Sequence, residues 1–339
     1  MPRRALVALP ALAAAAALLA SSAGGSHAAT SKRAGTQLAL VAYSTPATAF
    51  SKIIPAFQAT PAGQGVTFTQ SYGPAESQVR AIESGLPADV VDMALQPNIA
   101  SLVSAGLVSP RWKDNQYNGF VTRSVVAFVV RDGNPKHIRT WDDLVKPGVQ
   151  VVSPNPFSSG GARWNIMAAY GAMLKEGKTP KQAIAYLQQL FQHIVSQDSS
   201  ARNALQTFLA GKGDVLLTYE SDAILAKQSG QPVFYLDPKA DILIEQPAAV
   251  ISKSANVATA QAFVNFLHTP TAQTLFAQSG YRPVVRSVYR QFASQYPDPK
   301  QLFRIAYVGG WPKANQRFFD PTNGIIAKIE QGLGVSTGG

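Results

Sequence analysis

The segment NPFSSGGARW, residues 155–164, carries the clearest structural signal in the chain. The apolar run at 149–152 before it predicts a buried strand, and residues 164–174 after it predict a helix. A strand, a turn of small residues and a helix start direct free backbone N–H groups at an anion. The reason is that the first N–H groups of a helix have no intrahelical partner and the helix dipole is positive there. An ordinary capped helix behind a glycine turn fits the same pattern.

Three residues of this turn are suited to an oxyanion. Gly160 and Gly161 have no Cβ, so an oxygen atom can come close to the backbone. Ser159 adds a hydroxyl that can donate a hydrogen bond. The sequence therefore places a candidate anion site at the start of this helix.

Predicted strands and helices alternate along the rest of the chain. Strands are expected at 37–43, 66–71, 88–95, 124–131, 149–152, 214–218, 233–236 and 248–251. Helices are expected at 48–58, 74–84, 97–105, 164–174, 180–195, from about 200 to 209, from 222 onward, at 257–267, at 270–279 and within 301–329. This alternation predicts an α/β fold with mostly parallel sheets flanked by helices.

In such sheets, ligands bind beyond the carboxyl ends of the strands, where helix N-termini converge. Several turns of the chain have this position. They are Ser44-Thr45, Gly73-Pro74-Ala75, Ser159-Gly160-Gly161, Ser200-Ala201 and Tyr219. An anion site needs a set of this kind, although the sequence alone does not require that these turns meet.

Composition limits the possible classes of protein. The chain has 339 residues, enough for two domains, and 46% are hydrophobic while 14% are charged, which is typical of a globular protein with a core. Cysteine is absent, which excludes disulfides, zinc thiolate sites, iron–sulfur clusters and cysteine nucleophiles. The formal net charge is +11, but the basic residues are scattered and form no nucleic-acid-binding motif, so we expect no nucleic-acid partner.

Residues 1–28 have the features of an export signal peptide. Arg3 and Arg4 precede an apolar run at 5–20, and Ser26-His27-Ala28 is a small-x-small cleavage pattern. A membrane anchor is the alternative, but the apolar run is short against the roughly 20 residues of a span. No cysteine is present to carry a lipid. We therefore expect a periplasmic or secreted protein.

The sequence offers little for catalysis or metal binding. The 4 histidines are scattered and are expected on the surface or in packing, and no Gly-x-Ser-x-Gly, His-Glu-x-x-His or phosphate-binding loop is present. Asp89 and Asp92 are three apart on a predicted strand and so point to opposite faces. Tyr186, Tyr219 and Tyr281 suggest an iron-binding set, but the adjacent tyrosine pair of such sites is missing. We expect no enzyme, no catalytic residue, no metal and no cofactor.

Short motifs along the chain match a known family. They are ADVV at 88–91, VVR at 129–131 with GNPK at 133–136, WDDL at 141–144, KPGV at 146–149, PNP at 154–156 leading into SSGGARWN at 158–165, Asp198 with Ala201-Arg202, GDVL at 213–216, YRP at 281–283 and GGW at 309–311. With these motifs, the chain from about residue 38 to 329 resembles the periplasmic sulfate- and thiosulfate-binding proteins that feed ATP-driven importers.

The resemblance implies a fold and a set of site residues. The fold is the type II periplasmic-binding-protein fold, in which two α/β lobes are joined by hinge strands. Lobe one is expected at 36–123 plus 221–339 and lobe two at 124–220. The anion would be held by the Ser159 hydroxyl and by backbone N–H groups. These site residues are Ser44, Thr45, Ala75, Ser159, Gly160, Gly161, Ala201 and Tyr219.

Two positions depart from the family pattern. Tyr219 stands where the family places an indole donor, and a phenol can accept as well as donate. The turn Ser44-Thr45-Pro46-Ala47 replaces the family's Asp-Pro-Thr-Arg. Arg163 and Arg202, near two helix starts, are expected to form structural pairs at the rim and not to contact the anion.

The function that the resemblance implies is sulfate binding for an ABC permease, by a monomer. Thiosulfate, or another tetrahedral oxyanion such as molybdate, is the alternative ligand. An exported hydrolase of anionic esters is the alternative from another class, although no general base can be nominated near Ser159.

Overall fold

The computed structural model describes residues 35–335. From Gly35 onward the chain forms one compact unit. The predicted signal peptide, residues 1–28, lies outside the described residues. Within 35–335, no helix is both long and apolar enough to cross a membrane.

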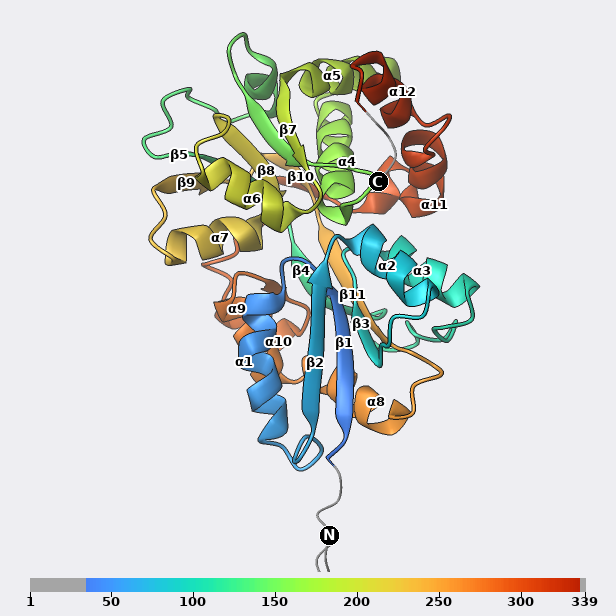
Figure 1. The fold of residues 1–339 in the computed structure, drawn as a ribbon. Helices are drawn as coiled ribbons and strands as arrows, with labels where there is room; N and C mark the ends of the chain where they lie inside the picture. The colour runs from blue at the N-terminus through green and yellow to red at the C-terminus, as the bar shows by residue number, and fades with distance from the viewer. Residues whose placement is uncertain (1–34, 336–339) are drawn as a thin grey trace, which may run out of the picture. The chain divides into compact units, whose positions relative to one another are not determined.

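The first sheet is 6-stranded, in the order β12-β4-β11-β3-β1-β2 (Figure 1). Its strands are β1 (Gln37–Tyr43), β2 (Thr67–Gly73), β3 (Val90–Asp92), β4 (Phe120–Ser124), β11 (Ile244–Val250) and β12 (Arg282–Pro283). β1 runs parallel to β2 and β3, whereas β11 and β12 pair antiparallel with their neighbours.

Helices cover both faces of this sheet. One face carries α1 (Ala47–Gln58), α8 (Val257–Leu267) and α9 (Pro270–Gln278), whose phenylalanines pack on Leu40 and Val90. The other face carries α2 (Ala75–Glu83) and α3 (Gln96–Ser104), which pack on Val41 and Val91. A strand buried on both faces must be apolar throughout, which explains the nearly continuous apolar run of β1.

The second sheet is 5-stranded, in the order β7-β6-β8-β5-β9. Its strands are β5 (Val126–Arg131), β6 (Val151–Pro154), β7 (Ile194–Asp198), β8 (Val215–Tyr219) and β9 (Val233–Leu236). β6 runs parallel to β7 and β8, and β5 pairs antiparallel with β8 and β9. Both sheets are thus mixed, not mostly parallel, because the strands that link them return in the opposite direction.

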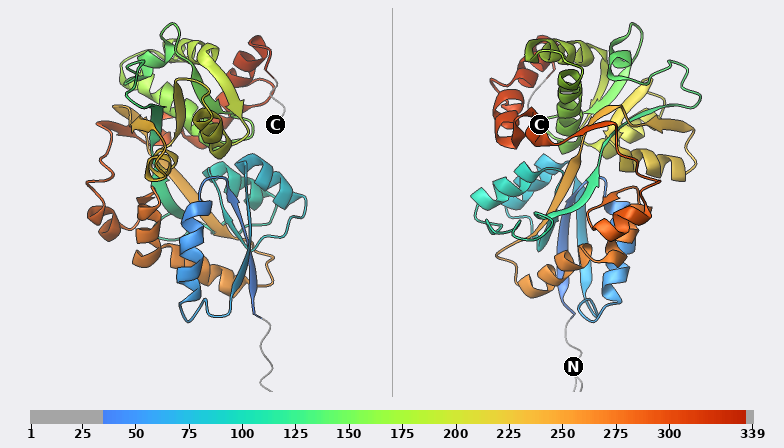
Figure 2. Two further views of the ribbon diagram at one scale, coloured as in Figure 1. Left: turned by 60° about the vertical axis from the view of Figure 1, so that its left-hand side comes forward. Right: turned by 180° about the vertical axis from the view of Figure 1, so that it is seen from behind.

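Helices also flank the second sheet (Figure 2). α6 (Ala201–Leu209) and α7 (Glu220–Gln228) pack with one apolar cluster of the sheet. α4 (Gly160–Lys175) and α5 (Pro180–His193) belong to the other cluster. That cluster also includes Trp311 of α11 (Gly310–Ala314) and Ile326 of α12 (Ile325–Gly332). The short α10 (Arg286–Gln291) lies near the first sheet, where Val288 packs with Val284.

The chain after residue 220 is divided between the two sheets. β9 pairs with β5 of the second sheet and the C-terminal helices pack on α4, whereas β11 and β12 belong to the first sheet. The predicted boundary, which gave all of 221–339 to lobe one, does not match this pairing. The physical reason is that the chain crosses between the sheets again after β9. A 2-stranded sheet of β10 (Ala240–Ile242) and β13 (Gln301–Phe303) lies along that return.

Other differences from the predicted elements are local. The helix expected at 180–195 ends at His193, and its last apolar residues begin β7, an edge strand with half-buried side chains. The strand expected at 124–131 is found as β5, which begins at Val126, whereas Ser124 is the last residue of β4 in the first sheet. β10, β12 and β13 have no more than three residues each and were not predicted.

Candidate ligand-binding site

A small cavity lies where several helix N-termini meet the end of β1. The cavity is small. It is lined by Tyr43, Ser44, Pro74, Ala75, Ala94, Ser159, Gly160, Gly161, Ser200, Ala201 and Tyr219. The turns that the sequence singled out therefore meet in space. Of the predicted site residues, Thr45 does not line the cavity.

The start of α4 presents backbone and hydroxyl donors to the cavity. Ser159 is the N-cap residue, and its hydroxyl makes no capping hydrogen bond within the described chain, so it is free to donate to a ligand. A Cβ on Gly160 would lie 2.6 Å from the Cβ of Ala94, and one on Gly161 would lie 3.1 Å from the Tyr219 ring. Glycine at both positions lets the helix start approach residues from both sheets.

The starts of α6 and α2 add further N–H groups. Ser200 caps α6 by accepting a hydrogen bond from the backbone N–H of Asn203 at 3.2 Å, and its hydroxyl proton can still donate. The N–H of Ala201 is a further donor that this turn can offer, since the first N–H of a helix has no intrahelical partner. Ala75 occupies the same position in α2, after the N-cap Pro74.

Two phenol groups border the cavity. Tyr43 and Tyr219 are each 2% exposed, their rings meet edge to face at 6.0 Å, and neither hydroxyl has a hydrogen-bond partner among the described residues. Burial raises the pKa of both phenols well above the ordinary value, so both are neutral donors at neutral pH. A buried hydroxyl without a partner is costly, and a ligand made of acceptors would satisfy both.

No side chain that lines this cavity among residues 35–335 is charged. Arg163 donates to the backbone oxygen of Pro156 at 2.9 Å and pairs with Glu76 at 3.4 Å. Arg202 donates to the backbone oxygen of Thr45 at 3.0 Å. Both arginines thus have structural partners, as their positions near helix starts predicted.

The polar contacts around the cavity join elements of the first and second sheets. The Trp164 indole on α4 donates to the Ala94 oxygen at 2.9 Å, and the Glu76 N–H on α2 donates to the Ser158 oxygen at 3.3 Å. The Arg163–Glu76 and Arg202–Thr45 contacts also run between the sheets. These contacts therefore link elements of the two sheets around the cavity.

Asp92 is a buried acid near the phenols that sequence reasoning did not assign to the site. It is 2% exposed, one carboxylate oxygen has no partner among the described residues, and burial raises its pKa well above the ordinary value. Its charge would act on Tyr43 and Tyr219. Asp222, in the first turn of α7, is also buried; burial raises its pKa to about 6 while it accepts a hydrogen bond from Thr218.

Sequence reasoning missed Tyr43 and Ala94, which both line the cavity. Tyr43 is the last residue of an apolar strand, where an aromatic side chain is ordinarily interpreted as core. Its position directly before the Ser44-Thr45 turn is the signal that could have placed it in the site.

None of the histidines among residues 35–335 lines the cavity. His193 and His268 contact the backbone oxygens of Val149 and Phe120, and His137 lies in a turn. No group of three or more metal-ligating side chains is found in residues 35–335.

The fold and the site define a class of extracellular solute-binding protein. A family model described as bacterial extracellular solute-binding protein matches residues 38–282, and the chain belongs to this family. It is 39% identical to a sulfate-binding protein of Synechococcus elongatus, over 98% of this chain and 97% of that relative. The solved structure of the sulfate-binding protein SubI from Mycobacterium tuberculosis is 42% identical, with a TM-score of 0.82 over 84% of this chain and 100% of that one. A thiosulfate-binding protein of Pseudomonas aeruginosa is 33% identical over 87% of this chain and 91% of the relative. The structural similarity confirms the predicted two-lobe periplasmic-binding-protein fold.

Proposed function

We propose that this chain binds sulfate in the cavity between its two sheets and delivers it to the membrane permease of an ABC importer. The names of its relatives support the ligand class, and the cavity supplies the chemistry. Ser44, Thr45, Ala75, Ser159, Gly160, Gly161, Ala201 and Tyr219 are the proposed binding residues, with Thr45 acting from behind the cavity wall and Tyr43 added to them.

The observation that carries the proposal is a cavity of hydrogen-bond donors without a charged side chain. Sulfate carries two negative charges and no proton at neutral pH, so it accepts hydrogen bonds and donates none. Each hydrogen bond to a charged group contributes about 1.5–3 kcal/mol, so several neutral donors can hold a buried dianion.

Selectivity follows from the same donor set. Phosphate retains a proton near neutral pH and is recognised best where a buried carboxylate accepts that proton. No aspartate or glutamate lines this cavity within the described chain, so phosphate would leave its own donor unpaired.

Thiosulfate is the second candidate ligand. It has the same charge and overall shape, one of the relatives is named for it, and Tyr219 in place of an indole alters one donor. Molybdate, a tetrahedral dianion of larger size, is a weaker alternative on the same chemistry.

We also propose that the chain catalyses no reaction. Hydrolysis of an anionic ester at Ser159 would need a general base within hydrogen-bond reach of its hydroxyl. No histidine, aspartate or glutamate among residues 35–335 lines the cavity. The cavity is therefore suited to binding and release.

During transport, each sheet and the helices that flank it act as one lobe. The anion docks between the lobes, the segments that cross between the sheets act as a hinge, and closure brings the donors of both lobes together. The closed monomer, exported by its signal peptide to the periplasm or secreted, is the form that the permease recognises.

Isothermal titration calorimetry of the mature chain with sulfate, thiosulfate, molybdate and phosphate tests the proposal. Sulfate is expected to bind at least tenfold more tightly than thiosulfate or molybdate, and phosphate is expected to give no heat. Tighter binding of phosphate than of sulfate, or turnover of a sulfate ester that is lost in Ser159→Ala, would reject it.

A further inference from the structure

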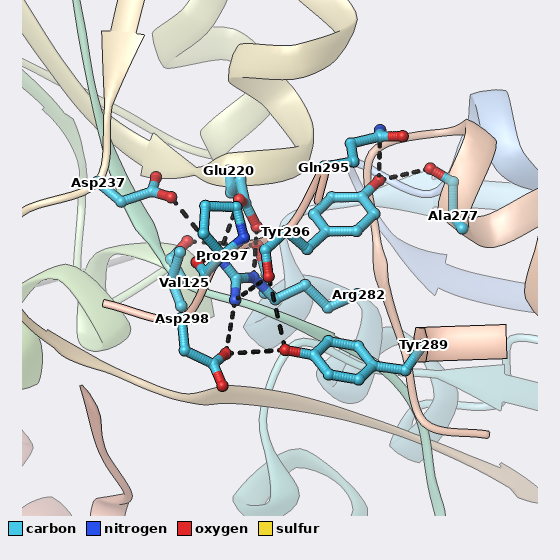
Figure 3. A network of polar contacts seen from close by, with 11 residues as sticks. Val125, Glu220, Asp237, Ala277, Arg282, Tyr289, Gln295, Tyr296, Pro297 and Asp298 are labelled. Carbon is cyan, nitrogen blue, oxygen red and sulfur yellow. Dashed lines mark hydrogen bonds and ion pairs between the residues drawn. The ribbon is translucent and has the colours of Figure 1, made fainter. Parts of the chain in front are cut away.

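A buried ion-pair network lies next to the ligand cavity (Figure 3). Arg282 in β12 has a side chain that is 1% exposed, and it contacts Glu220 through two nitrogens, Nε at 2.6 Å and Nη2 at 3.0 Å. Its Nη1 donates to Asp298 at 2.9 Å, and its Nη2 lies 3.5 Å from Asp237. One guanidinium therefore faces several acids in a water-poor environment.

This network lies where the chain crosses between the two sheets. Arg282 belongs to the first sheet, whereas Glu220 begins α7, directly after β8 of the second sheet. The N–H of Glu220 donates at 3.0 Å to the oxygen of Val125, the residue that joins β4 to β5. The first turn of α7 is thus fixed at the crossing by its backbone and by its side chain.

Glu220 follows Tyr219 directly in sequence. Tyr219 is the N-cap residue of α7, so its backbone position is set by the same turn that Arg282 holds. Gly280 lies against this turn as well, because a Cβ there would be 2.9 Å from both Cα and the backbone oxygen of Ser221. The segment before β12 therefore packs directly on the first turn of α7, which follows Tyr219.

Tyr281, the residue directly before β12, reaches the other side of the site. The hydroxyls of Tyr281 and Thr45 are hydrogen bonded at 3.2 Å, and Thr45 lies in the turn that brings Ser44 to the cavity. Consecutive residues of the YRP motif thus hold two parts of the cavity wall, one from each sheet.

We propose that Arg282 is a positioning residue of the ligand site: its two-point contact with Glu220 fixes the first turn of α7, so that the Tyr219 hydroxyl is directed at the bound anion. This inference rests on the proposed function, because it assigns Arg282 a part in the same site.

The chemistry of the pair favours positioning over simple stabilisation. Replacing a buried ion pair by apolar side chains of similar volume is often neutral or stabilising, so stability alone does not account for it. A planar guanidinium that engages both oxygens of a carboxylate fixes direction as well as distance, which a lysine ammonium cannot do. Arg282→Lys is therefore a change that keeps the charge and removes the directional restraint.

Sulfate titration of matched variants provides the first test. Arg282→Lys is expected to bind sulfate about tenfold less tightly than the natural chain, the scale of one weakened hydrogen bond to a charged ligand. Asp298→Asn is the control, because Asp298 contacts the same guanidinium but is 58% exposed and does not belong to α7. It is expected to change affinity by less than about twofold, as for exposed ion pairs. Equal affinities of Arg282→Lys and the natural chain would overturn the inference.

A double-mutant cycle separates positioning from a general structural effect. In a Tyr219→Phe background the hydroxyl to be positioned is gone, so Arg282→Lys is expected to lower affinity by less than about a further twofold. If Arg282→Lys weakens binding by the same factor in both backgrounds, Arg282 does not act through the Tyr219 hydroxyl and the inference fails.

Glu220→Gln repeats the cycle from the other partner, should Arg282→Lys not fold. Near-ultraviolet circular dichroism without sulfate identifies the variants that retain native packing. The two possible failures are distinct. A natural chain that does not bind sulfate rejects the proposed function, whereas a chain that binds sulfate but gives an additive cycle rejects the role of Arg282 alone.

Discussion

The cavity and the Arg282 network include adjacent residues, Tyr219 and Glu220, yet the cavity is lined by neutral groups and the network consists of charged side chains. The cavity has neutral donors and no charged side chain, and the hydroxyls of Tyr43 and Tyr219 have no partner among the described residues. The network has a buried guanidinium that contacts Glu220 and Asp298 at 2.6 to 3.0 Å. The cavity therefore has donors that a ligand can use, whereas the charges of the network are paired with one another.

In the proposed site, neutral donors would hold a dianion without a cation. A buried cation in the cavity would need its own partner when no ligand is present, and that partner would then compete with the ligand. Neutral donors avoid the cost of a buried, unpaired charge, although each unpaired hydroxyl carries a smaller cost. The rigidity that such a set of donors requires comes from the charged network behind it.

The largest expected effect comes from placing a charge in the neutral region. Gly161→Asp should abolish sulfate binding, with an affinity loss of at least about 1,000-fold. Its Cβ would lie 3.1 Å from the Tyr219 ring, and its carboxylate would repel the anion at short range where screening by water is weak. Calorimetric titration measures the loss.

Gly332→Asp is the matched control for this variant. A Cβ at Gly332 meets nothing within 4 Å, and the position lies at the end of α12, away from the cavity lining. Gly332→Asp should bind sulfate as the natural chain does. Retained binding in Gly161→Asp would mean that the anion is held elsewhere.

The second effect comes from removing the charge from the charged region. Arg282→Met leaves Glu220 buried without its partner and should lower the free energy of unfolding by about 3–5 kcal/mol. Urea denaturation measures this change. Arg111→Met removes the exposed partner of Asp114, whose side chains are 83% and 53% exposed, and should cost about 0–1 kcal/mol. Similar losses in the two variants would mean that the network is solvated in solution.

The sequence predicts the cavity better than it predicts the Arg282 network, for physical reasons. The cavity turns were predictable because each depends on local chemistry: small residues after a strand, a helix start, a serine before two glycines. Strand β1 and helix α1 were predictable because their apolar patterns are local too. The meeting of the turns depends on the order of strands in two sheets, which no single segment encodes.

The Arg282 network was not predictable by the same reasoning. Arg282 and Glu220 are 62 residues apart, and each looks like an ordinary surface residue in its own segment. The YRP motif was noticed only through its family resemblance. The division of 221–339 between the sheets was missed for a similar reason, because β9, β10 and β13 are too short to show a period and owe their pairing to long-range contacts.

The third prediction concerns the pH dependence of the free energy of unfolding, to which Asp237 of the network contributes. Burial, with Glu220 nearby, raises the pKa of Asp237 to about 8 from an ordinary 3.8. Between these values the folded protein binds a proton that the unfolded chain has released, so this group lowers stability as pH rises through the window. Asp237→Asn should make the decline in the free energy of unfolding between pH 5 and 8 less steep.

The titratable and charged neighbours of Asp237 also affect how stability depends on pH. They are Arg282, Glu220 and Asp241, with the phenol of Tyr235 alongside. Some decline should remain in Asp237→Asn, because burial also raises the pKa of Glu220 and Asp241. Urea midpoints measured at each pH provide the comparison, and identical slopes in both proteins would contradict the prediction.

The smallest effect separates two serines that the sequence presents alike. Ser200 accepts a hydrogen bond from the Asn203 N–H, whereas Ser159 makes no capping bond within the described chain. Ser200→Ala should therefore lose about 1 kcal/mol of stability, the typical value of an N-cap. Ser159→Ala should lose little stability but lower sulfate affinity about tenfold or more, because its hydroxyl makes no capping bond and donates to the ligand in the proposed site. Denaturation and calorimetry on both variants measure the two effects. If Ser159→Ala destabilises the fold as much as Ser200→Ala does and binds sulfate as tightly as the natural chain, the hydroxyl at the start of α4 is a helix cap and is not what the anion uses.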